Sequence, residues 1–518
     1  MRAVPSLPLK PAALMLCLVP PWLFNYTIAP TLNWWPWFVS ALCGVGVSLA
    51  WGRVSAQWLA ASWLAAALIS CVIALVQYFG GSDHAWAAHW ISQTPAGEAY
   101  GNLRQRNQFA SLTSIGLAAL MACVALRAPA APGRLTFWHI PAWAWAAALL
   151  LALGNAVSSS RTGLLQWVLL LALVLWWHRA GRRPLVWLTA VALLAYLLAL
   201  RAMPALLSLV TGLDGTDLFG RMAQAGSDSR IVLWANVLTL IAQKPWFGWG
   251  WGELDYAHFM AAFPGARFPE LLGNAHNLPL HLAVELGIPV ALIACAAVAA
   301  LVRAGKPWRE TDAGRQLAWA VLAVIGLHSL LEYPLWYGPF QLAVLLCAAW
   351  LWQTREAALP ASRPARLKPA LATLAVLALG WAGADYWRVS QAFFVPVSQR
   401  LASSWGGPPS QAKNSWLFAP QVAFAELVTT DVTPANAPAM HTLALRVLHY
   451  SPEPRVIEKL LDSARLAGLQ ADVARYEDRY ARANPREYAR WRQKNAAGDQ
   501  PAAIKAPSTA PASATSSR

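Results

Sequence analysis

Apolar runs of about 20 residues, the length that crosses the hydrocarbon core of a bilayer as a helix, recur along most of the chain. Short polar segments separate them. On this criterion the chain contains about eleven predicted spans, at residues 11–30, 34–51, 57–79, 108–126, 139–156, 162–178, 184–203, 278–302, 315–331, 336–353 and 369–387. The pattern therefore predicts an all-α polytopic membrane protein.

Three of these spans affect the topology. The first is similar in length to a signal peptide, but no small-residue cleavage site follows it and further spans come at once, so we expect it to be retained. The fifth and sixth spans are separated only by Asn155–Arg161. Merging these two into one helix would reverse the orientation of everything that follows.

Positive charge near the spans gives the orientation, because cytoplasmic segments carry an excess of Lys and Arg. With a cytoplasmic N-terminus, the inner segments hold 16 such residues: Arg2, Lys10, Arg53, Arg127, Arg134, Arg179, Arg182, Arg183, Arg303, Lys306, Arg309, Arg315, Arg355, Arg363, Arg366 and Lys368. The outer loops before the last span hold 7: Arg104, Arg106, Arg161, Arg221, Arg230, Lys244 and Arg267. We therefore predict a multi-pass membrane protein with a cytoplasmic N-terminus, whose long loop 206–277 and C-terminal region lie on the outer side of the membrane.

After the last span the composition changes, which divides the chain into a membrane domain (1–388), a helical domain (389–494) and an Ala/Ser/Pro-rich disordered tail (495–518). Helical periodicity in the second part is broken at Pro452, Gly468 and Pro485. One apolar stripe comprises Ile457, Leu460, Leu461 and Ala464. A second begins with Tyr476, Tyr480 and Tyr488. Short antiparallel helix pairs are expected.

Composition narrows the class further. Only 12% of the 518 residues are charged, against about 25% in an average soluble domain. The net charge of +16 is distributed between spans and the C-terminal region, and does not form the single basic face of a nucleic-acid-binding protein. The six cysteines lie in apolar runs without metal-binding spacing, and there is no HExxH motif. No metal or other cofactor is expected.

A polar segment precedes the fourth span. It contains four groups that can donate hydrogen bonds to phosphate or sugar oxygens: Arg104, Gln105, Arg106 and Gln108. The alternative is an ordinary polar helix entry.

Two further arginines lie at predicted helix starts on the outer face. Arg161 occupies a very short turn, where it either binds phosphate together with the helix N-terminus or extends to lipid headgroups. Arg230 opens a helical run that ends in a Trp/Gly-rich segment. An interfacial helix would explain the aromatics, but a cation is electrostatically disfavoured at a helix start, so Arg230 is expected to have a further role.

A histidine, His276, stands where the long loop enters the next span, flanked by Asn274 and Asn277. Ionisable groups at membrane depth are costly and usually functional. A neutral imidazole there could take a proton from a hydroxyl while arginines neutralise a departing pyrophosphate. Two other histidines lie four residues before a glutamate and could simply pair with it, as His281 with Glu285 and His328 with Glu332.

Five segments together resemble the family that unites bacterial O-antigen ligases, O-antigen polymerases and pilin-type protein O-oligosaccharyltransferases, the Wzy_C-like membrane glycosyltransferases. They are GNLRQRNQ (101–108), SSSRTG (158–163), SRIVLWANVLTLIAQKPWFGWGWG (229–252), NAHNLPLHLAVELG (274–287) and HSLLEYPLWY (328–337). Each is short, but their order and spacing make the set specific. The first and last look most like the protein O-oligosaccharyltransferase branch, as does the helical C-terminal region.

The resemblance implies a GT-C-like fold in the bacterial inner membrane that transfers a glycan from undecaprenyl pyrophosphate on the periplasmic side, without metal, so the outer loop 206–277 and the C-terminal region would be periplasmic. His276 matches the family's loop histidine, and Arg161 and Arg230 match arginines associated with the lipid pyrophosphate. Asn277 is expected to orient the histidine or the substrate. The family's glutamine and tyrosine each have two candidates here, Gln105 or Gln108 and Tyr333 or Tyr337.

We therefore expect en bloc, inverting transfer of a lipid-linked oligosaccharide to Ser or Thr of pilin-like periplasmic proteins. An alternative with the same chemistry is O-antigen ligation to lipid A–core. A third, of another class, is a transporter of the same lipid. Transport does not explain a histidine beside arginines at one surface, and no internal repeat is evident.

Overall fold

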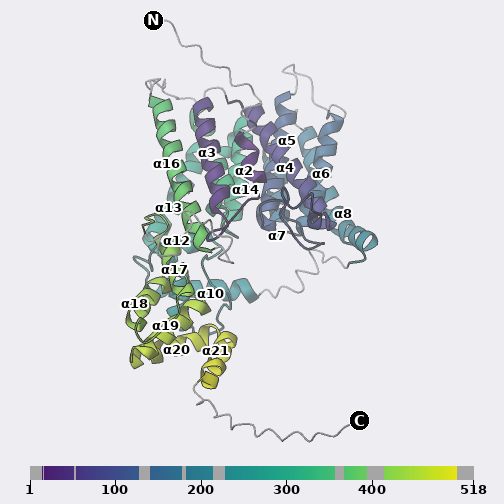
Figure 1. Ribbon diagram of the computed structural model, residues 1–518. Coiled ribbons are helices and arrows are strands. Elements are labelled where there is room, and N and C mark those ends of the chain that lie inside the picture. Colours follow the sequence, from purple (N-terminus) through teal and green to yellow (C-terminus); the bar gives the residue numbers. More distant parts are fainter. Residues whose placement is uncertain are drawn as a thin grey trace, which may run out of the picture.

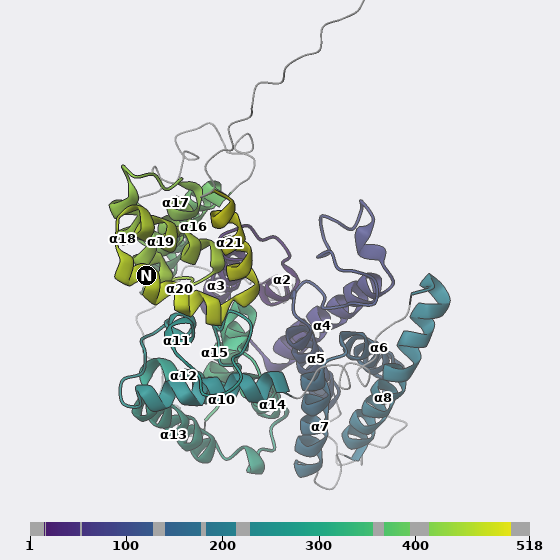
Figure 2. The same ribbon diagram turned by 90° about the horizontal axis from the view of Figure 1, so that it is seen from below.

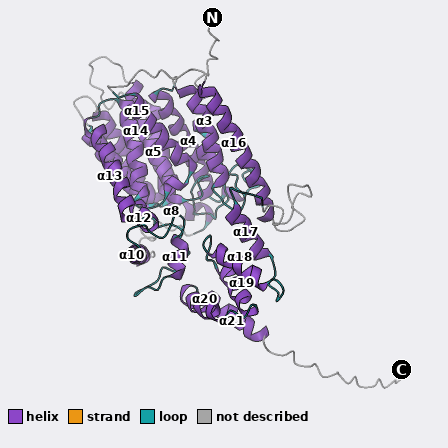
Figure 3. Cartoon of the chain, turned by 90° about the vertical axis from the view of Figure 1, so that its left-hand side faces the viewer, coloured by secondary structure: helices purple, strands orange, loops and turns teal. Residues whose placement is uncertain are grey.

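The computed structural model describes residues 15, 17–51, 54–127, 140–177, 183–213, 228–355, 367–393 and 414–498. Every regular element in these ranges is a helix (Figure 3). A bundle of roughly parallel helices fills the upper part of Figure 1, and a second group of helices lies beneath it. The all-α class is therefore confirmed.

The bundle consists of α2 (Pro20–Leu23), α3 (Trp34–Ala50), α4 (Ala56–Tyr78), α5 (Arg106–Arg127), α6 (Ala142–Ser158), α7 (Arg161–Trp176), α8 (Arg183–Thr211), α12 (Leu278–Leu286), α13 (Ile288–Gly305), α14 (Ala313–Ser329), α15 (Gly338–Gln353) and α16 (Leu367–Ser390). The lower group consists of α10 (Asp228–Gln243), α11 (Leu254–Met260), α17 (Ala419–Thr429), α18 (Ala437–Leu448), α19 (Pro454–Leu466), α20 (Gln470–Ala483) and α21 (Pro485–Gly498). Short 3₁₀ turns are η2 (Gly81–Asp83), η4 (Pro307–Arg309), η5 (Pro334–Trp336) and η6 (Gln391–Phe393).

Several helices of the bundle are long and apolar enough to cross a bilayer. Five described segments meet both conditions: Ala56–Tyr78, Arg106–Arg127, Arg183–Thr211, Ile288–Arg309 and Leu367–Phe393. Shorter apolar helices such as α3, α6, α7 and α15 accompany them. A polytopic membrane protein fits these findings.

Helix α5 is the centre of the bundle, because 89% of its most apolar stretch is buried. Its side chains Phe109, Leu112 and Ile115 have no exposed surface. Gly116 allows close approach of two neighbours, since a Cβ there would lie 2.4 Å from Ala67 Cβ and 2.9 Å from Leu151 Cδ2. Small residues at helix crossings are the usual means of tight packing in membranes.

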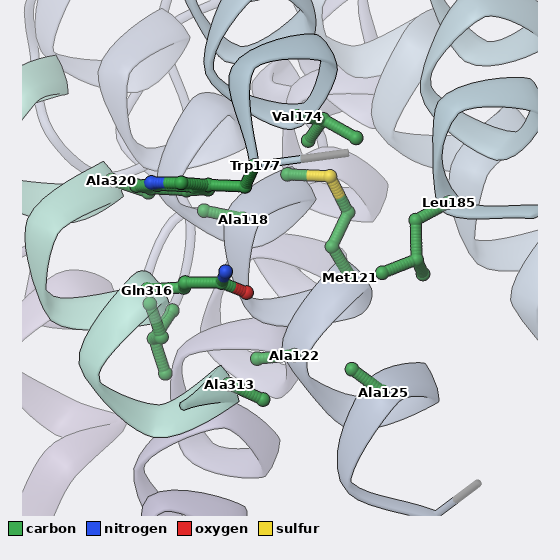
Figure 4. A pocket seen from close by; sticks show the side chains of 11 residues that line it. Ala118, Met121, Ala122, Ala125, Val174, Trp177, Leu185, Ala313, Gln316 and Ala320 are labelled. Atoms are coloured by element: carbon green, nitrogen blue, oxygen red, sulfur yellow. The ribbon is translucent and has the colours of Figure 1, made fainter. Parts of the chain in front are cut away.

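A small cavity interrupts this packing at the end of the bundle remote from His276. It measures about 40 Å³ and is bounded by Met121 of α5, Trp177 after α7 and Gln316 of α14, among mostly apolar groups (Figure 4). The remainder of the lining is aliphatic. The cavity has no polar cluster that would suit a substrate.

The predicted span 278–302 was wrong as one continuous helix, because the chain breaks at Gly287 into α12 and α13. Gly287 has φ +88°, and a Cβ there would lie 2.2 Å from the carbonyl oxygen of Trp246. The Trp/Gly-rich segment before α11 crosses this break. Its Trp249 and Gly250 donate backbone hydrogen bonds to the carbonyls of Val284 and Glu285, both at 2.9 Å.

The predicted start of the long loop at Leu206 was also wrong, because α8 continues through Pro204 to Thr211. The first predicted span is described only in part, and its largest described helix is the short α2. The predicted fifth and sixth spans are separate helices, α6 and α7, divided at Ser159 in a left-handed conformation (φ 49°).

The C-terminal helices α17 to α21 share one apolar cluster. The stripe Ile457, Leu460, Leu461 and Ala464 is fully buried. Gly468 (φ +73°) separates α19 from α20, and Pro485 begins α21. Helix α21 continues to Gly498, so the predicted tail boundary at Asn495 was slightly too early; residues 499–518 lie outside the described residues.

One helix of the long loop belongs to this C-terminal group. Phe259 of α11 is buried in its apolar cluster. Tyr256 stacks on His449 with ring centroids 3.8 Å apart, and His449 Nδ1 lies 2.8 Å from Glu253 Oε2. Viewed from below in Figure 2, the C-terminal helices and the α10–α12 region lie next to each other on one side of the molecule.

Candidate functional site

A single carboxylate, Glu332, gathers side chains from three distant parts of the chain. His276 Nδ1 lies 2.7 Å from Oε2, and Arg230 Nη2 lies 3.0 Å from Oε1. Asn107 Nδ2 donates to Oε1 at 3.1 Å, and Gln105 Nε2 to Oε2 at 3.4 Å. All four partners donate to one acceptor pair, so we call this set the Glu332 cluster.

Each member of the Glu332 cluster is placed by the end of a helix. Gln105 and Asn107 stand at the start of α5, Arg230 lies in the first turn of α10, and Glu332 follows α14. Helix α10 also fixes the histidine loop, because Trp234, one turn after Arg230, donates from Nε1 to the Ala275 carbonyl at 3.1 Å. Helix α10, for which the sequence suggested an interfacial position, therefore makes two contacts at the site, one through Arg230 and one through Trp234.

The histidine itself is held in an unusual backbone conformation. His276 has φ 50°, a left-handed value that is uncommon outside glycine. Its N–H donates to Asn274 Oδ1 at 2.8 Å, which stabilises the turn. Strained conformations of this kind persist where the surrounding structure enforces them and are frequent at functional sites.

Electrostatics at Glu332 determine which form of the histidine is present. Burial alone would raise the pKa of Glu332, whose side chain is only 7% exposed, but the hydrogen bond and charge of His276, with Arg230, hold that pKa below its usual range. Glu332 is therefore ionised at neutral pH and can only accept hydrogen bonds. Nδ1 of His276 therefore carries a hydrogen toward Glu332, so in the neutral imidazole Nε2 is the proton acceptor.

Two tyrosines border the imidazole. The Tyr333 ring meets His276 edge to face at a centroid distance of 5.1 Å and stacks on Tyr337 at 6.0 Å. Both predicted tyrosines are thus near the histidine, with Tyr333 in direct contact. An aromatic wall of this kind is suited to the apolar face of a sugar or to shielding a proton transfer from water.

Arg161 is connected to the cluster through its neighbour. Ser160 Oγ donates to Asn107 Oδ1 at 2.7 Å and accepts from the Gly163 N–H at 3.1 Å, capping α7. Arg161, the first residue of α7, is exposed beside this cap. The N-terminus of α7 and its cation therefore lie next to the group that holds Glu332.

Three predicted residues have other roles. Arg104, in a left-handed conformation, bonds the Thr27 hydroxyl and, at 2.6 Å, the Asn25 carbonyl. Arg106 forms a 2.5 Å ion pair with Glu98. Gln108 is fully buried within α5. The structure does not bring these three side chains to His276, and of the two candidate glutamines it places Gln105 in the cluster.

Asn277 acts as the N-cap of α12. Its Oδ1 accepts from the Leu280 N–H and its Nδ2 donates to the Leu330 carbonyl, both at 3.1 Å. The second contact joins the start of α12 to the end of α14, and so helps to keep His276 next to Glu332.

The suggested pairing of His281 with Glu285 is present at 3.4 Å, whereas His328 and Glu332 bind different partners. His328 Nδ1 lies 2.8 Å from Ser111 Oγ, one helical turn deeper than the cluster. Sequence reasoning therefore missed Glu332 as the centre of the site, and it also missed Asn107. The sequence did offer one indication of their role: Asn107 lies in the segment 101–108 and Glu332 in the segment 328–337, the two that look most like the protein O-oligosaccharyltransferase branch.

Within the described ranges, no group of three or more His, Cys, Asp or Glu side chains is arranged to hold a metal ion.

Family models of known proteins match each segment of the chain that contributes to the Glu332 cluster. Family models match residues 99–122 (protein glycosylation ligase), 146–295 (O-antigen ligase) and 316–497 (virulence factor membrane-bound polymerase, C-terminal). The general O-oligosaccharyltransferase of Acinetobacter baylyi is 26% identical over 290 residues, which are 54% of this chain and 48% of that protein. The match thus spans about half the length of that relative.

The three family matches follow one another along the chain and meet at the Glu332 cluster, with Gln105 and Asn107 in the first, Arg230 and His276 in the second and Glu332 in the third. The chain is therefore similar, in successive segments between residues 99 and 497, to membrane glycosyltransferases that include O-antigen ligases and protein glycosylation ligases.

Proposed function

We propose that this protein transfers an oligosaccharide en bloc from undecaprenyl pyrophosphate to Ser or Thr hydroxyls of pilin-like periplasmic proteins, with inversion and without a metal. The observation that carries the proposal is the 2.7 Å contact between His276 Nδ1 and Glu332 Oε2. A carboxylate on one ring nitrogen fixes the tautomer and leaves the other nitrogen basic, as general base catalysis requires.

In this mechanism Nε2 of His276 removes the proton of the acceptor hydroxyl as its oxygen attacks the anomeric carbon. The bond between that carbon and the pyrophosphate oxygen breaks, and the electron pair leaves with undecaprenyl pyrophosphate. Glu332 stabilises the imidazolium that forms, which then releases its proton to solvent. Attack opposite to the leaving group inverts the anomeric centre.

Arg161 and Arg230 are proposed to bind the pyrophosphate. Arg230 has 37% of its side chain exposed while paired with Glu332, so part of its guanidinium faces outward. Arg161 is exposed at a helix N-terminus, where backbone N–H groups and the helix dipole favour an anion. Guanidinium groups bind phosphate oxygens in pairs, which suits stabilisation of developing negative charge.

Ligation to lipid A–core is the second candidate, because the O-antigen ligase model matches residues 146–295, which include His276 and both arginines. The match of residues 99–122 to the protein glycosylation ligase model favours a protein acceptor. Expression with a defined undecaprenyl-linked glycan, followed by mass analysis of pilin and of lipopolysaccharide, separates the two. Glycan on lipopolysaccharide alone would contradict the proposed acceptor.

The base assignment is tested with His276→Gln, because glutamine can hold a sugar or phosphate but takes no proton at neutral pH. We expect transfer to fall by about 10²–10⁴-fold with donor binding largely kept. His449→Gln is the matched control, since His449 also pairs with a glutamate and is about half exposed. Near-normal single-turnover transfer by His276→Gln would refute the assignment.

The proposed topology places the Glu332 cluster and the domain 389–494 in the periplasm and the N-terminus in the cytoplasm. The cation asymmetry of 16 against 7 supports it. A reporter fused at Gly468 should therefore behave as exported, and one fused at Lys306 as cytoplasmic. The reverse result would invert the proposed orientation.

A further inference from the structure

A second cavity in the bundle lies away from the Glu332 cluster. It is a groove of about 680 Å³ between α3, α15 and α16. Aliphatic side chains such as Val45, Leu345 and Leu371 supply most of its lining. A groove of this size and character in a bilayer is filled by hydrocarbon.

Helices α3 and α15 approach each other closely at the end of the groove nearer His276. There α3 and α15 touch, since a Cβ on Gly338 would lie 2.7 Å from Ser40 Cβ. Trp37 Nε1 also donates to Gln341 Oε1 at 2.9 Å across the same crossing. These four residues form that end of the groove's lining, and their close packing argues against entry of a lipid tail from the Glu332 cluster.

The other end of the groove carries a positive charge. Helix α16 lines it only with residues of its first half, from Lys368 to Ala375, which are remote from His276. Lys368 is exposed there, and within the described ranges no carboxylate forms an ion pair with it. Arg355, at the end of α15 on the same side, lies over the Trp352 ring at 3.3 Å.

The length of the groove indicates the size of its occupant. Its lining on α15 runs from Gly338 to Ala349. Eleven helical steps correspond to about 17 Å, roughly half of a hydrocarbon core about 30 Å thick. One leaflet, and hence one acyl chain, matches this span.

We propose that the groove binds one anionic glycerophospholipid of the leaflet remote from His276, with an acyl chain between α3, α15 and α16 and its phosphate at Lys368. Basic pockets between membrane helices recognise anionic headgroups in this manner. The site is independent of the transfer reaction proposed above.

The test uses the full chain, purified in mild detergent and mixed with equal amounts of phosphatidylglycerol and phosphatidylethanolamine bearing identical acyl chains. Native mass spectrometry should find one phosphatidylglycerol retained in preference. Lys368→Ala should reduce that preference about fivefold, because one basic residue near a lipid surface contributes about 1 kcal/mol to the binding of an anionic lipid. Arg303→Ala, at the same end of the bundle on α13, should leave it unchanged.

A second variant tests the hydrocarbon part. Ala375→Trp fills the groove and should abolish retention of either lipid, whereas Ala296→Trp, the same change on the exposed face of α13, should not. If Ala375→Trp proves unstable, Ala375→Leu provides a smaller obstruction. Equal retention of both phospholipids by the native protein would overturn the proposal, and so would displacement of phosphatidylglycerol by a polyprenyl phosphate.

Discussion

Replacing Glu332 by glutamine removes one charge at the centre of the cluster while keeping the size of the side chain. Four groups donate to its two carboxylate oxygens, at 2.7, 3.0, 3.1 and 3.4 Å. A glutamine offers one oxygen and one NH₂ group, so at least one donor must face another donor. Leaving a buried donor unsatisfied costs about 1–3 kcal/mol, more where the donor is charged.

The catalytic effect follows from which donor is left unpaired. If the amide nitrogen faces His276, the favoured tautomer carries its hydrogen on Nε2, and the proposed base is lost. If it faces Arg230 and Asn107, the guanidinium loses its partner and is no longer held in place. We therefore expect transfer to fall by about 10²–10⁴-fold, the range of general base catalysis.

The assay is single-turnover transfer from a defined lipid-linked glycan in proteoliposomes, with donor binding measured separately. Glu253→Gln is the control, because Glu253 also pairs with a histidine, at 2.8 Å, but outside the cluster. The reasoning is refuted if Glu332→Gln transfers within threefold of the native rate, or if Glu253→Gln loses as much. A variant that loses donor binding as well would place Glu332 in substrate binding instead.

Three further predictions follow from other contacts. Arg161→Lys and Arg230→Lys should each retain only part of the transfer rate, because lysine lacks the paired N–H groups that bind pyrophosphate, and normal rates would remove both from that role. Gly248→Ala should lower the melting temperature more than Gly252→Ala, since both glycines have positive φ but only at Gly248 would a Cβ meet backbone, 2.3 Å from Glu285; equal shifts would contradict this. Burial of the imidazole, and to a lesser extent the positive charge of Arg267, lower the pKa of His258 to about 3. Between about pH 3 and 6.5 the unfolded chain therefore binds one more proton at this residue than the folded chain, and the stability of the fold decreases as the pH falls through that window. From pH 7 to pH 5 the loss should be about 2 kcal/mol and should be absent in His258→Gln, as measured by unfolding at the two pH values.

Local sequence patterns predicted the features that depend on neighbouring residues. Apolar runs of helical length identified the all-α class, and the stripe at Ile457 identified the face that α19 buries. The same reasoning failed at Gly287, because an apolar run does not reveal that a distant backbone segment will pack against it. The sequence shows the glycines of the Trp/Gly-rich segment, but not why glycine is required there. The requirement comes from close contact with backbone about forty residues away along the chain.

The candidate site was predictable to a similar extent. The sequence indicated His276 because an ionisable group at the entrance of a span is rare. It also predicted that His276 lies near Arg230, because both residues belong to the same outer loop. Glu332 did not stand out, since His328 four residues earlier offered a sufficient local partner. Only the fold shows that residues 105, 230 and 276 converge on this one carboxylate, a contact set spanning more than 200 positions of sequence.

The packing of α11 into the C-terminal helices has a consequence for experiments on the acceptor. Phe259 is buried among residues of α17 to α20, and Tyr256 and Met260 pack against the same apolar cluster. A deletion after α16 would strip this cover from the loop that leads to His276. Loss of transfer in such a truncation would therefore report a misplaced base as readily as a missing acceptor. Acceptor recognition is better mapped by charge reversals on the outer surface of α21, at Arg490 or Arg486, which leave the apolar cluster intact.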